Sequence, residues 1–190
     1  AIRQLLLAEE TAVVPDGISV VKAMNLLGLP AKERITGVDL ADKLLRRAGE
    51  QGKSVYLLGA KEEVVSALAQ KLKAQYPQME VRYKNGYSKD KDADFRDIEA
   101  FQPDLVLVAL GVPAQEKLIA RHLGNFSKGV FIGVGGSFDV LSGSKRRAPA
   151  LFVKTNTEWL YRILREPSRL GRFYRNNIKF LGEVRKEAKG

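Results

Sequence analysis

The 190-residue sequence lacks cysteine and contains a single histidine, His122. Without cysteine the chain can form neither disulfides nor thiolate metal sites, and one histidine cannot build a multi-histidine metal site. The lack of cysteine also fits a reducing compartment. His122 falls on the surface side of a predicted helix, so we expect it to have a structural role.

Long apolar runs and complete nucleotide-binding motifs are also absent. The longest apolar stretches, LVLVALGV and VFIGV, have the length of strands, and a membrane-spanning helix needs roughly 18 residues. The run Gly133-Val134-Gly135-Gly136 lacks the spacing of a GxGxxG motif, and there is no Walker loop. Residue 1 is alanine with no signal-peptide pattern after it, so we expect the chain to be trimmed or incomplete at its start.

The positive charge is concentrated at one end of an otherwise ordinary globular composition. The formal net charge is +10. From residue 145 to residue 190, 13 Lys and Arg stand against four Glu, which leaves the remainder nearly neutral. A cationic end suits a phosphate-bearing partner, namely a membrane surface, a nucleotide or a nucleic acid.

Strand-like and helix-like segments alternate through the middle of the chain. Strands are predicted over 54–60, 79–87, 103–111 and 129–136, and helices over 61–77, 92–101 and 113–123. The third strand is apolar throughout, as strands covered on both faces are. This order predicts the α/β class, with a Rossmann-like parallel-sheet sandwich and helices on both faces.

The two ends of the chain are predicted to be mostly helical. We expect helices over 1–10, 18–28 and up to residue 52, a short strand over 11–17, and one helix over 150–167. From Ser168 onward, an amphipathic pattern predicts a helix with a cationic polar face. We therefore predict an α/β domain over 1–145 and a basic helical C-terminal appendage over 146–190.

Glycines close three of the predicted strands: Gly59, Gly111, and the pair Gly135 and Gly136. Ligands of open parallel sheets bind beyond the carboxyl ends of the strands, and bare backbone lets a phosphate approach. The three strand ends together are compatible with a nucleotide or sugar-phosphate ligand, and at any one position a glycine that simply turns the chain is equally expected.

Polar residues lie near the same strand ends. Gln115 and Glu116 fall in the first turn of one predicted helix, and Asp139 falls in the first turn of the next. Asp16 lies at a strand-to-helix turn. Acidic residues are ordinary at helix starts, where they complement the helix dipole, so none of these positions alone indicates a site.

Taken together, seven segments resemble the WecG/TagA/CpsF glycosyltransferases, in the order seen in that family. They are VPDGISVV, ERITGVDL, YLLGA, NGY, VALGVPAQEK, GVGGSFDVLSGSKRRAP and EWLYRILREPSR, and the resemblance covers the chain from about residue 2 onward. It implies that an N-acetylmannosamine-type sugar is transferred with inversion from a UDP donor to a lipid-linked N-acetylglucosamine diphosphate, in envelope polymer synthesis such as that of wall teichoic acid. It implies no required metal.

The resemblance also assigns roles to single residues. Asp16 becomes the catalytic base, and Arg34 is placed near the donor diphosphate or the acceptor. Gln115 and Asp139 are placed along the sugar and nucleotide pocket, beside the strand-end glycines. The tail arginines implied to move over the active site are Arg162, Arg169 and Arg172. The family's Thr and Asn pair falls upstream of residue 1, so we expect the pocket to be incomplete here.

The chemistry of sugar transfer agrees with these roles. The attacking hydroxyl must lose a proton, which a carboxylate can accept, and the leaving diphosphate needs cations or N–H groups. Asp92-Ala93-Asp94 has the form of a metal-binding Asp-x-Asp motif, but we interpret it as the acidic start of a helix. We expect no metal and no cofactor, since the UDP-sugar is a substrate. The bases of residues 145–147 are expected either to contact phosphate or to be solvated.

Partners and alternatives follow from the charge. The basic tail predicts contact with an anionic membrane, and hence a cytoplasmic protein peripheral to the inner face of the membrane. A homo-oligomer would also cover the apolar side of the tail. Alternatives are another UDP-sugar such as N-acetylmannosaminuronate or a glucose or galactose derivative, a nucleotide-binding protein without activity, and a nucleic-acid-binding module. The last is disfavoured because the aromatics do not interleave with the bases.

Overall fold

The structure is a computed structural model that describes residues 7–9, 11–29, 31, 33–174 and 179–188, without the side chains of Arg162, Arg169, Arg172, Phe173 and Glu187. It divides into two compact units. Unit 1 comprises residues 1–13 and 37–146, and unit 2 comprises residues 14–36 and 147–190. The predicted division into a catalytic domain over 1–145 and an appendage over 146–190 stays a prediction, because these units are defined by packing and not by activity.

Unit 1 is built on a sheet of four parallel strands in the order β2-β1-β3-β4. The strands are β1 (Ser54–Gly59), β2 (Glu80–Lys84), β3 (Leu105–Ala109) and β4 (Val130–Gly133). In the register of the sheet, Val55 pairs with Val81 on one side and with Leu105 on the other, and Leu105 pairs with Val130. Every residue of β3 is buried, as its unbroken apolar sequence predicts.

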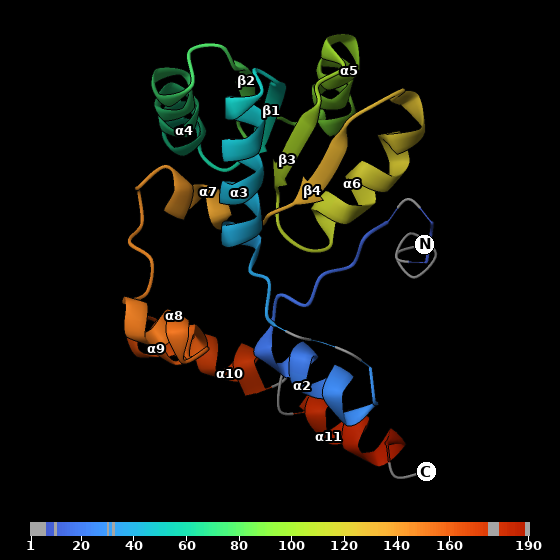
Figure 1. Ribbon diagram of the computed structural model, residues 1–190, viewed down its shortest axis with the longest axis vertical. Coiled ribbons are helices and arrows are strands. Elements are labelled where there is room, and N and C mark those ends of the chain that lie inside the picture. Colours follow the sequence, from blue (N-terminus) through green and yellow to red (C-terminus); the bar gives the residue numbers. More distant parts are fainter. Residues whose placement is uncertain (1–6, 10, 30, 32, 175–178, 189–190) are drawn as a thin grey trace. The chain divides into compact units, whose positions relative to one another are not determined.

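Helices cover both faces of this sheet, as the alternation of segments predicted (Figure 1). One face packs against α3 (Gly37–Glu50), α4 (Glu62–Gln75) and α7 (Ser137–Leu141), and the other against α5 (Lys91–Phe101) and α6 (Ala114–His122), which continues into the 3-10 helix η1 (Leu123–Asn125). Successive residues of β1 point to opposite faces of the sheet. Leu57 packs in the core cluster under α3, α4 and α7, and Tyr56 and Leu58 pack in the cluster under α5 and α6. The fold class is confirmed.

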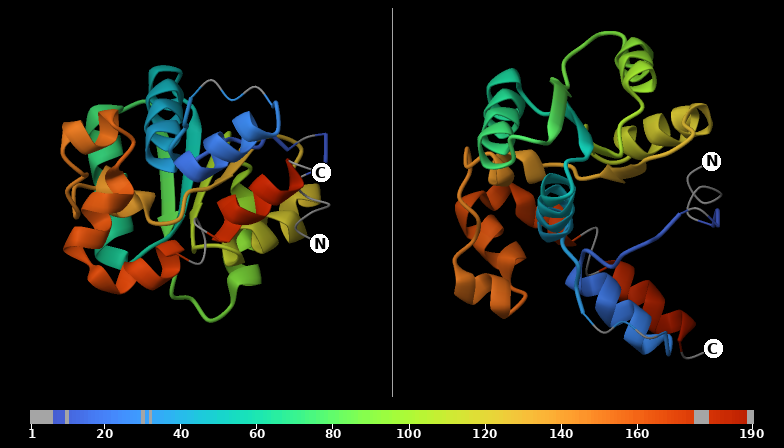
Figure 2. Two further views of the ribbon diagram at one scale, coloured as in Figure 1. Left: turned by 90° about the horizontal axis from the view of Figure 1, so that it is seen from below. Right: turned by 45° about the horizontal axis from the view of Figure 1, so that its top comes forward.

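Unit 2 consists of helices. They are α2 (Ile18–Leu26), α8 (Ala150–Lys154), α9 (Glu158–Arg165), the 3-10 helix η2 (Pro167–Arg169), α10 (Leu170–Phe173) and α11 (Lys179–Glu187). Helix α8 packs against α9, and α11 packs against α2, so the end of the chain lies beside a segment from its beginning (Figure 2). In the described part of the chain, none of the helices has both the length and the apolarity to cross a bilayer.

Two predictions for the ends of the chain are wrong. Residues 11–16 form no strand; Val13 is 64% exposed, so this segment lacks the packing that would hold a strand. The single helix expected over 150–167 is two helices, because Asn156 adopts a left-handed conformation with φ of 57° and ends α8. Of the helix predicted over 1–10, residues 7–9 form a turn or bend, and the others lie outside the described residues.

Candidate active site

The strand order of unit 1 creates a switch point between β1 and β3. The chain leaves β1 toward α4 on one face and leaves β3 toward α6 on the other, so a crevice is expected where the two connections part. At this point the two strands approach closely. A Cβ on Gly59 would lie 2.4 Å from the carbonyl oxygen of Ala109. Close packing against β3 therefore explains Gly59 without reference to a ligand.

The loops that follow β1, β2, β3 and β4 form what we call the carboxyl-end rim, comprising residues 59–61, 85–90, 110–113 and 134–136. Backbone hydrogen bonds join the first of these loops to their neighbours. The amide of Ala60 donates to the carbonyl of Ala109 over 3.1 Å, and the amide of Gly86 donates to the carbonyl of Ala60 over 2.8 Å. Backbone hydrogen bonds thus connect the β1 loop to the end of β3 and to the β2 loop.

Tyr87 is the exposed aromatic residue of the β2 loop. Its side chain is 71% exposed, and its backbone amide donates a hydrogen bond to Oδ1 of Asn85 over 2.9 Å. Asn85 in turn donates to Glu62 over 2.7 Å. A fixed loop that displays an aromatic ring suits a planar ligand group. Sequence reasoning singled out the NGY segment but did not name Tyr87, and its signal would have been an aromatic residue directly after a turn.

Gln115 connects two other loops of the rim. Its side chain is buried, and its Oε1 accepts hydrogen bonds from the backbone amides of Gly111 and Gly135, each over 3.1 Å. Its Nε2 donates to Oε1 of Glu116 over 2.9 Å. The structure thus brings Gln115, Gly111 and Gly135 together, and the amide group of Gln115 forms its hydrogen bonds within the protein. A ligand contact by Gln115 stays a prediction.

Asp139 lies in the first turn of α7, and Gly136 is the N-cap of that helix. Its Oδ2 is 3.1 Å from Nζ of Lys145, and its carbonyl accepts the amide of the same lysine over 2.7 Å. The three bases of residues 145–147 differ in their contacts. Lys145 pairs with Asp139 in unit 1, Arg146 is exposed, and Arg147 lies 3.5 Å from Glu158 within unit 2.

In unit 2, a backbone hydrogen bond joins the segments that contain Asp16 and Arg34. The amide of Ile35 donates to the carbonyl of Pro15 over 3.0 Å. Asp16 is exposed and precedes α2, whose N-cap is Gly17. An exposed carboxylate at the start of a helix is accessible to a substrate hydroxyl, which is a requirement for a general base.

Arg34 is engaged by an acid that sequence reasoning missed. Its Nη2 donates to Oε2 of Glu158, in the first turn of α9. The two side chains are only 10% and 7% exposed. Removing either partner would leave an unpaired buried charge, which destabilises a protein. The ion pair therefore connects α9 to the segment that contains Arg34. The signal for Glu158 was a lone acid in a strongly basic stretch. The side chains of the tail arginines Arg162, Arg169 and Arg172 lie outside the described residues.

The carboxylates of the Asp-x-Asp motif are paired with basic side chains. Asp92 is 2.9 Å from Nη1 of Arg121 and 2.7 Å from Nε2 of His122. These hydrogen bonds, with that of His122 the largest cause, lower the pKa of Asp92 below its usual value. Asp94 has no exposed surface and lies 3.0 Å from Nζ of Lys84. Across the described ranges, no cluster of three or more His, Asp or Glu side chains could hold a metal ion.

His122 is buried, so its predicted surface position is wrong. It lies between two carboxylates, Asp92 and Glu99, and its ring stacks on Phe95 with the centroids 4.8 Å apart. The hydrogen bond from Asn125, followed by that from His122, lowers the pKa of Glu99. His122 thus joins α5 to α6, which agrees with a structural role.

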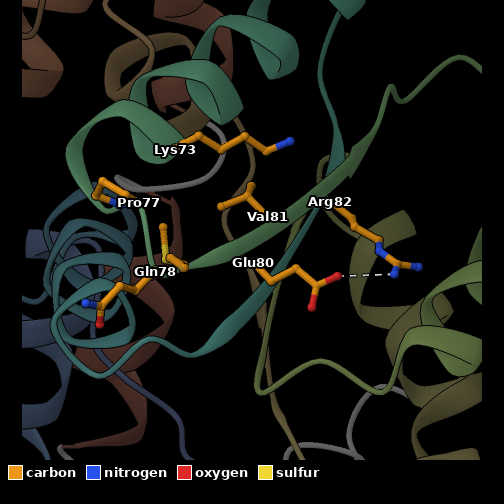
Figure 3. A pocket seen from close by; sticks show the side chains of 7 residues that line it. Lys73, Pro77, Gln78, Glu80, Val81 and Arg82 are labelled. Atoms are coloured by element: carbon orange, nitrogen blue, oxygen red, sulfur yellow. Dashed lines mark hydrogen bonds and ion pairs between the residues drawn. The ribbon is translucent and has the colours of Figure 1, made fainter.

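A shallow concavity lies at the start of β2, on the sheet end opposite the carboxyl-end rim (Figure 3). Its lining residues are Lys73, Pro77, Gln78, Met79, Glu80, Val81 and Arg82. Glu80 and Arg82 pair across 3.2 Å, and Arg82 also lies over the ring of Phe101. Because ligands of parallel sheets bind at the carboxyl ends of the strands, we do not place the site here.

Comparison with known proteins identifies relatives over most of the chain. The profile described as "Glycosyl transferase WecG/TagA/CpsF family" matches residues 2–190. A protein of Bacillus spizizenii is 40% identical over 167 residues, which are 87% of this chain and 65% of the relative. A Bacillus subtilis protein is 39% identical over 164 residues, 86% of this chain and 64% of the relative. A Staphylococcus aureus protein is 40% identical over 168 residues, 88% and 66% of the two chains.

These three relatives share the name N-acetylglucosaminyldiphosphoundecaprenol N-acetyl-beta-D-mannosaminyltransferase. The chain spans slightly less than two thirds of the length of each of them.

Proposed function

The chain belongs to the WecG/TagA/CpsF family of glycosyltransferases, and on that premise we propose that it transfers an N-acetylmannosamine-type sugar from a UDP donor to a lipid-linked N-acetylglucosamine diphosphate. The observation that carries this proposal is the match of the family over residues 2–190, together with relatives about 40% identical that are named for this transfer. In this reading the product is a lipid-linked disaccharide used for a bacterial envelope polymer.

We place the UDP donor at the carboxyl-end rim of unit 1. The switch point between β1 and β3 supports this placement, because open parallel sheets bind nucleotides there. The exposed ring of Tyr87 offers a surface on which the uracil base can stack. The remaining proposed contacts come from the sequence-based prediction: Gly59, Gly111, Gly135, Gly136 and Asp139. Gln115, which belonged to the same prediction, lies behind Gly111 and Gly135 and bonds to their backbone amides.

We assign the proton transfer to Asp16. In the proposed step, the acceptor hydroxyl oxygen forms a bond to the anomeric carbon while the bond from that carbon to the donor diphosphate breaks. The electron pair of the broken bond leaves with UDP, and Asp16 accepts the hydroxyl proton. The anomeric configuration inverts, because attack and departure occur on opposite faces of the sugar.

We propose that cationic side chains stabilise the leaving diphosphate without a metal. The candidates are Arg34 and the tail arginines Arg162, Arg169 and Arg172, because guanidinium groups bind phosphate through two hydrogen bonds at once. Arg34 must then exchange its bond to Glu158 for one to the substrate. The carboxylates of Asp92 and Asp94 are already paired with cations, which argues against a metal at that motif.

Unit 2 is the proposed membrane-contacting part. Among its described residues, ten large apolar side chains are exposed: Val14, Val20, Leu26, Leu27, Leu29, Leu151, Leu160, Leu164, Leu170 and Tyr174. Exposed cations accompany them on α11, at Lys179, Arg185 and Lys186. Exposed apolar groups beside basic residues are typical of a surface that binds anionic lipid. Peripheral binding at the inner face of the membrane would bring the enzyme to its lipid-linked acceptor.

The test is a panel of UDP-sugars offered to the full-length protein with a lipid-diphosphate N-acetylglucosamine acceptor, with the product identified by its mass. We expect transfer from UDP-N-acetylmannosamine. Transfer from a different UDP-sugar would keep the reaction and replace the donor. No transfer from any donor, combined with no binding of UDP, would refute the proposed function.

A further inference from the structure

The side chain of Gln115 is buried between the loops that follow β3 and β4. Its residue is 2% exposed, and all three hydrogen bonds of its amide end within the protein, at Gly111, Gly135 and Glu116. Gly111 follows β3 and Gly135 follows β4, so one side chain joins the loops of two neighbouring strands.

The chemistry of the three partners requires an amide at position 115. Two backbone N–H groups point at one atom, and only an acceptor oxygen can satisfy both. The other end of the group must donate, because it faces Oε1 of Glu116 at 2.9 Å. An aliphatic side chain would leave the partly buried amides of Gly111 and Gly135 without this acceptor.

Gly133, at the end of β4, lies close to the same amide group. A Cβ on Gly133 would lie 2.5 Å from Nε2 of Gln115, which is closer than non-bonded atoms can approach. A larger residue at position 133 would therefore displace the side chain of Gln115 from its observed position. Three separate features, namely two amide donors, one carboxylate and one bare backbone position, converge on this side chain.

We propose that Gln115 is a positioning residue that holds the β3 and β4 loops at a fixed separation for the nucleotide, and that Glu116 orients its amide. Gln115 acts through the backbone of Gly111 and Gly135 and does not itself touch the ligand. This inference rests on the proposed function for the identity of the ligand. The hydrogen bonds on which it is built do not depend on that function.

The experiment reverses the polarity of the pair. Gln115→Glu keeps an oxygen for the two backbone amides but sets its second oxygen against the carboxylate of Glu116. Adding Glu116→Gln restores a donor and an acceptor with the roles exchanged. We expect the single variant to bind UDP at least tenfold more weakly and the double variant to return to within about threefold of the original. Gln78→Glu, an exposed glutamine at the start of β2, controls for the added charge.

The same variants distinguish positioning from direct contact. If Gln115 touched the diphosphate, the double variant would place a carboxylate against it, and binding would stay weak; that result overturns the proposal. Hydrogen exchange of the Gly111 and Gly135 amides, measured without ligand, gives an independent readout. We expect faster exchange in the single variant and recovery in the double variant, whereas unchanged exchange in the single variant also overturns the proposal. If the original protein fails to bind UDP, the proposed function fails. The exchange data still show whether Gln115 holds the β3 and β4 loops in position.

Discussion

Asp16 and Asp94 show how differently two aspartates of one chain can be placed. Asp94 is enclosed and lies beside two lysine side chains, Lys84 and Lys91, so it contributes to the packing of α5. Asp16 is exposed at the start of α2. Asp94 is closed off from a substrate, whereas the exposed position of Asp16 is compatible with the role of base that the family resemblance implies.

The variant Asp16→Asn tests this assignment. We expect transfer to fall by at least about 100-fold, because general base catalysis contributes 10²–10⁴-fold, while UDP affinity stays nearly unchanged. Single-turnover rates and UDP titration measure the two quantities. Asp42→Asn, an exposed aspartate on α3, is the matched control. Full activity of Asp16→Asn would remove the residue from the reaction.

Asp104 allows a prediction about stability and pH. Its carboxylate accepts hydrogen bonds from the backbone amide and the hydroxyl of Ser54, at the start of β1. The bond from the backbone amide is the largest cause that lowers the pKa of Asp104 from 3.8 to about 2. A pKa that is lower in the folded state stabilises the protein above the unfolded value. This stabilisation is complete above a pH of about 3.8 and disappears as the pH falls toward about 2.

We therefore expect Asp104→Asn to lower the free energy of unfolding at neutral pH and to have progressively less effect below a pH of about 4. Urea unfolding at several pH values measures this difference. Asp90→Asn, which removes the charge of an exposed N-cap residue of α5 and keeps an acceptor oxygen, shows how large the loss of one exposed carboxylate charge is. A difference that stayed constant down to pH 2 would contradict the assigned role of Asp104.

At the level of elements, the strands of unit 1 were predictable and the tail helices were not. The apolar runs of β1 and β3 leave little choice but a buried strand. The segment 150–167 has continuous helical spacing, yet Asn156 interrupts it, and the hydroxyl of Thr155 bonds to the carbonyl of Leu151 over 2.8 Å. Local hydrogen bonds of Thr and Asn compete with helix continuation, and periodicity does not record that competition.

Helix α11 is the element on which membrane contact can be tested. It packs against α2, and its Val184 is buried, so deleting it would remove packing as well as charge. Reversing its exposed cations with Lys179→Glu, Arg185→Glu and Lys186→Glu leaves that packing in place. Each basic residue near an anionic surface contributes about 1 kcal/mol. We expect binding to vesicles of anionic lipid to weaken by at least 100-fold, measured by co-sedimentation.

The control for α11 is the same number of reversals in unit 1, with Arg47→Glu, Lys53→Glu and Lys73→Glu, all at exposed positions. The two variants have equal net charge. If both bind vesicles equally well, net charge and not α11 determines the contact, and the assignment of the membrane surface to unit 2 is wrong.

For the molecule as a whole, the charge distribution and the pairing of its acids lead to a prediction about metals. The acids of the Asp-x-Asp motif lie within ion-pair distance of Arg121, His122 and lysines, while the net positive charge is concentrated from residue 145 onward. We expect EDTA to leave turnover of the full-length enzyme unchanged, measured as UDP released per minute. If EDTA inhibits the enzyme and added Mg²⁺ or Mn²⁺ restores its activity, Asp92 and Asp94 again become candidate metal ligands.

The sequence by itself determined the sheet, its flanking helices, the concentration of charge after residue 145 and the family, because these follow from local periodicity, composition and long shared motifs. Only the tertiary structure decided what each polar side chain contacts. Gln115 meets Gly135 across 20 positions and Arg34 meets Glu158 across 124. No local pattern encodes such pairs, since they depend on how distant segments are brought together by packing.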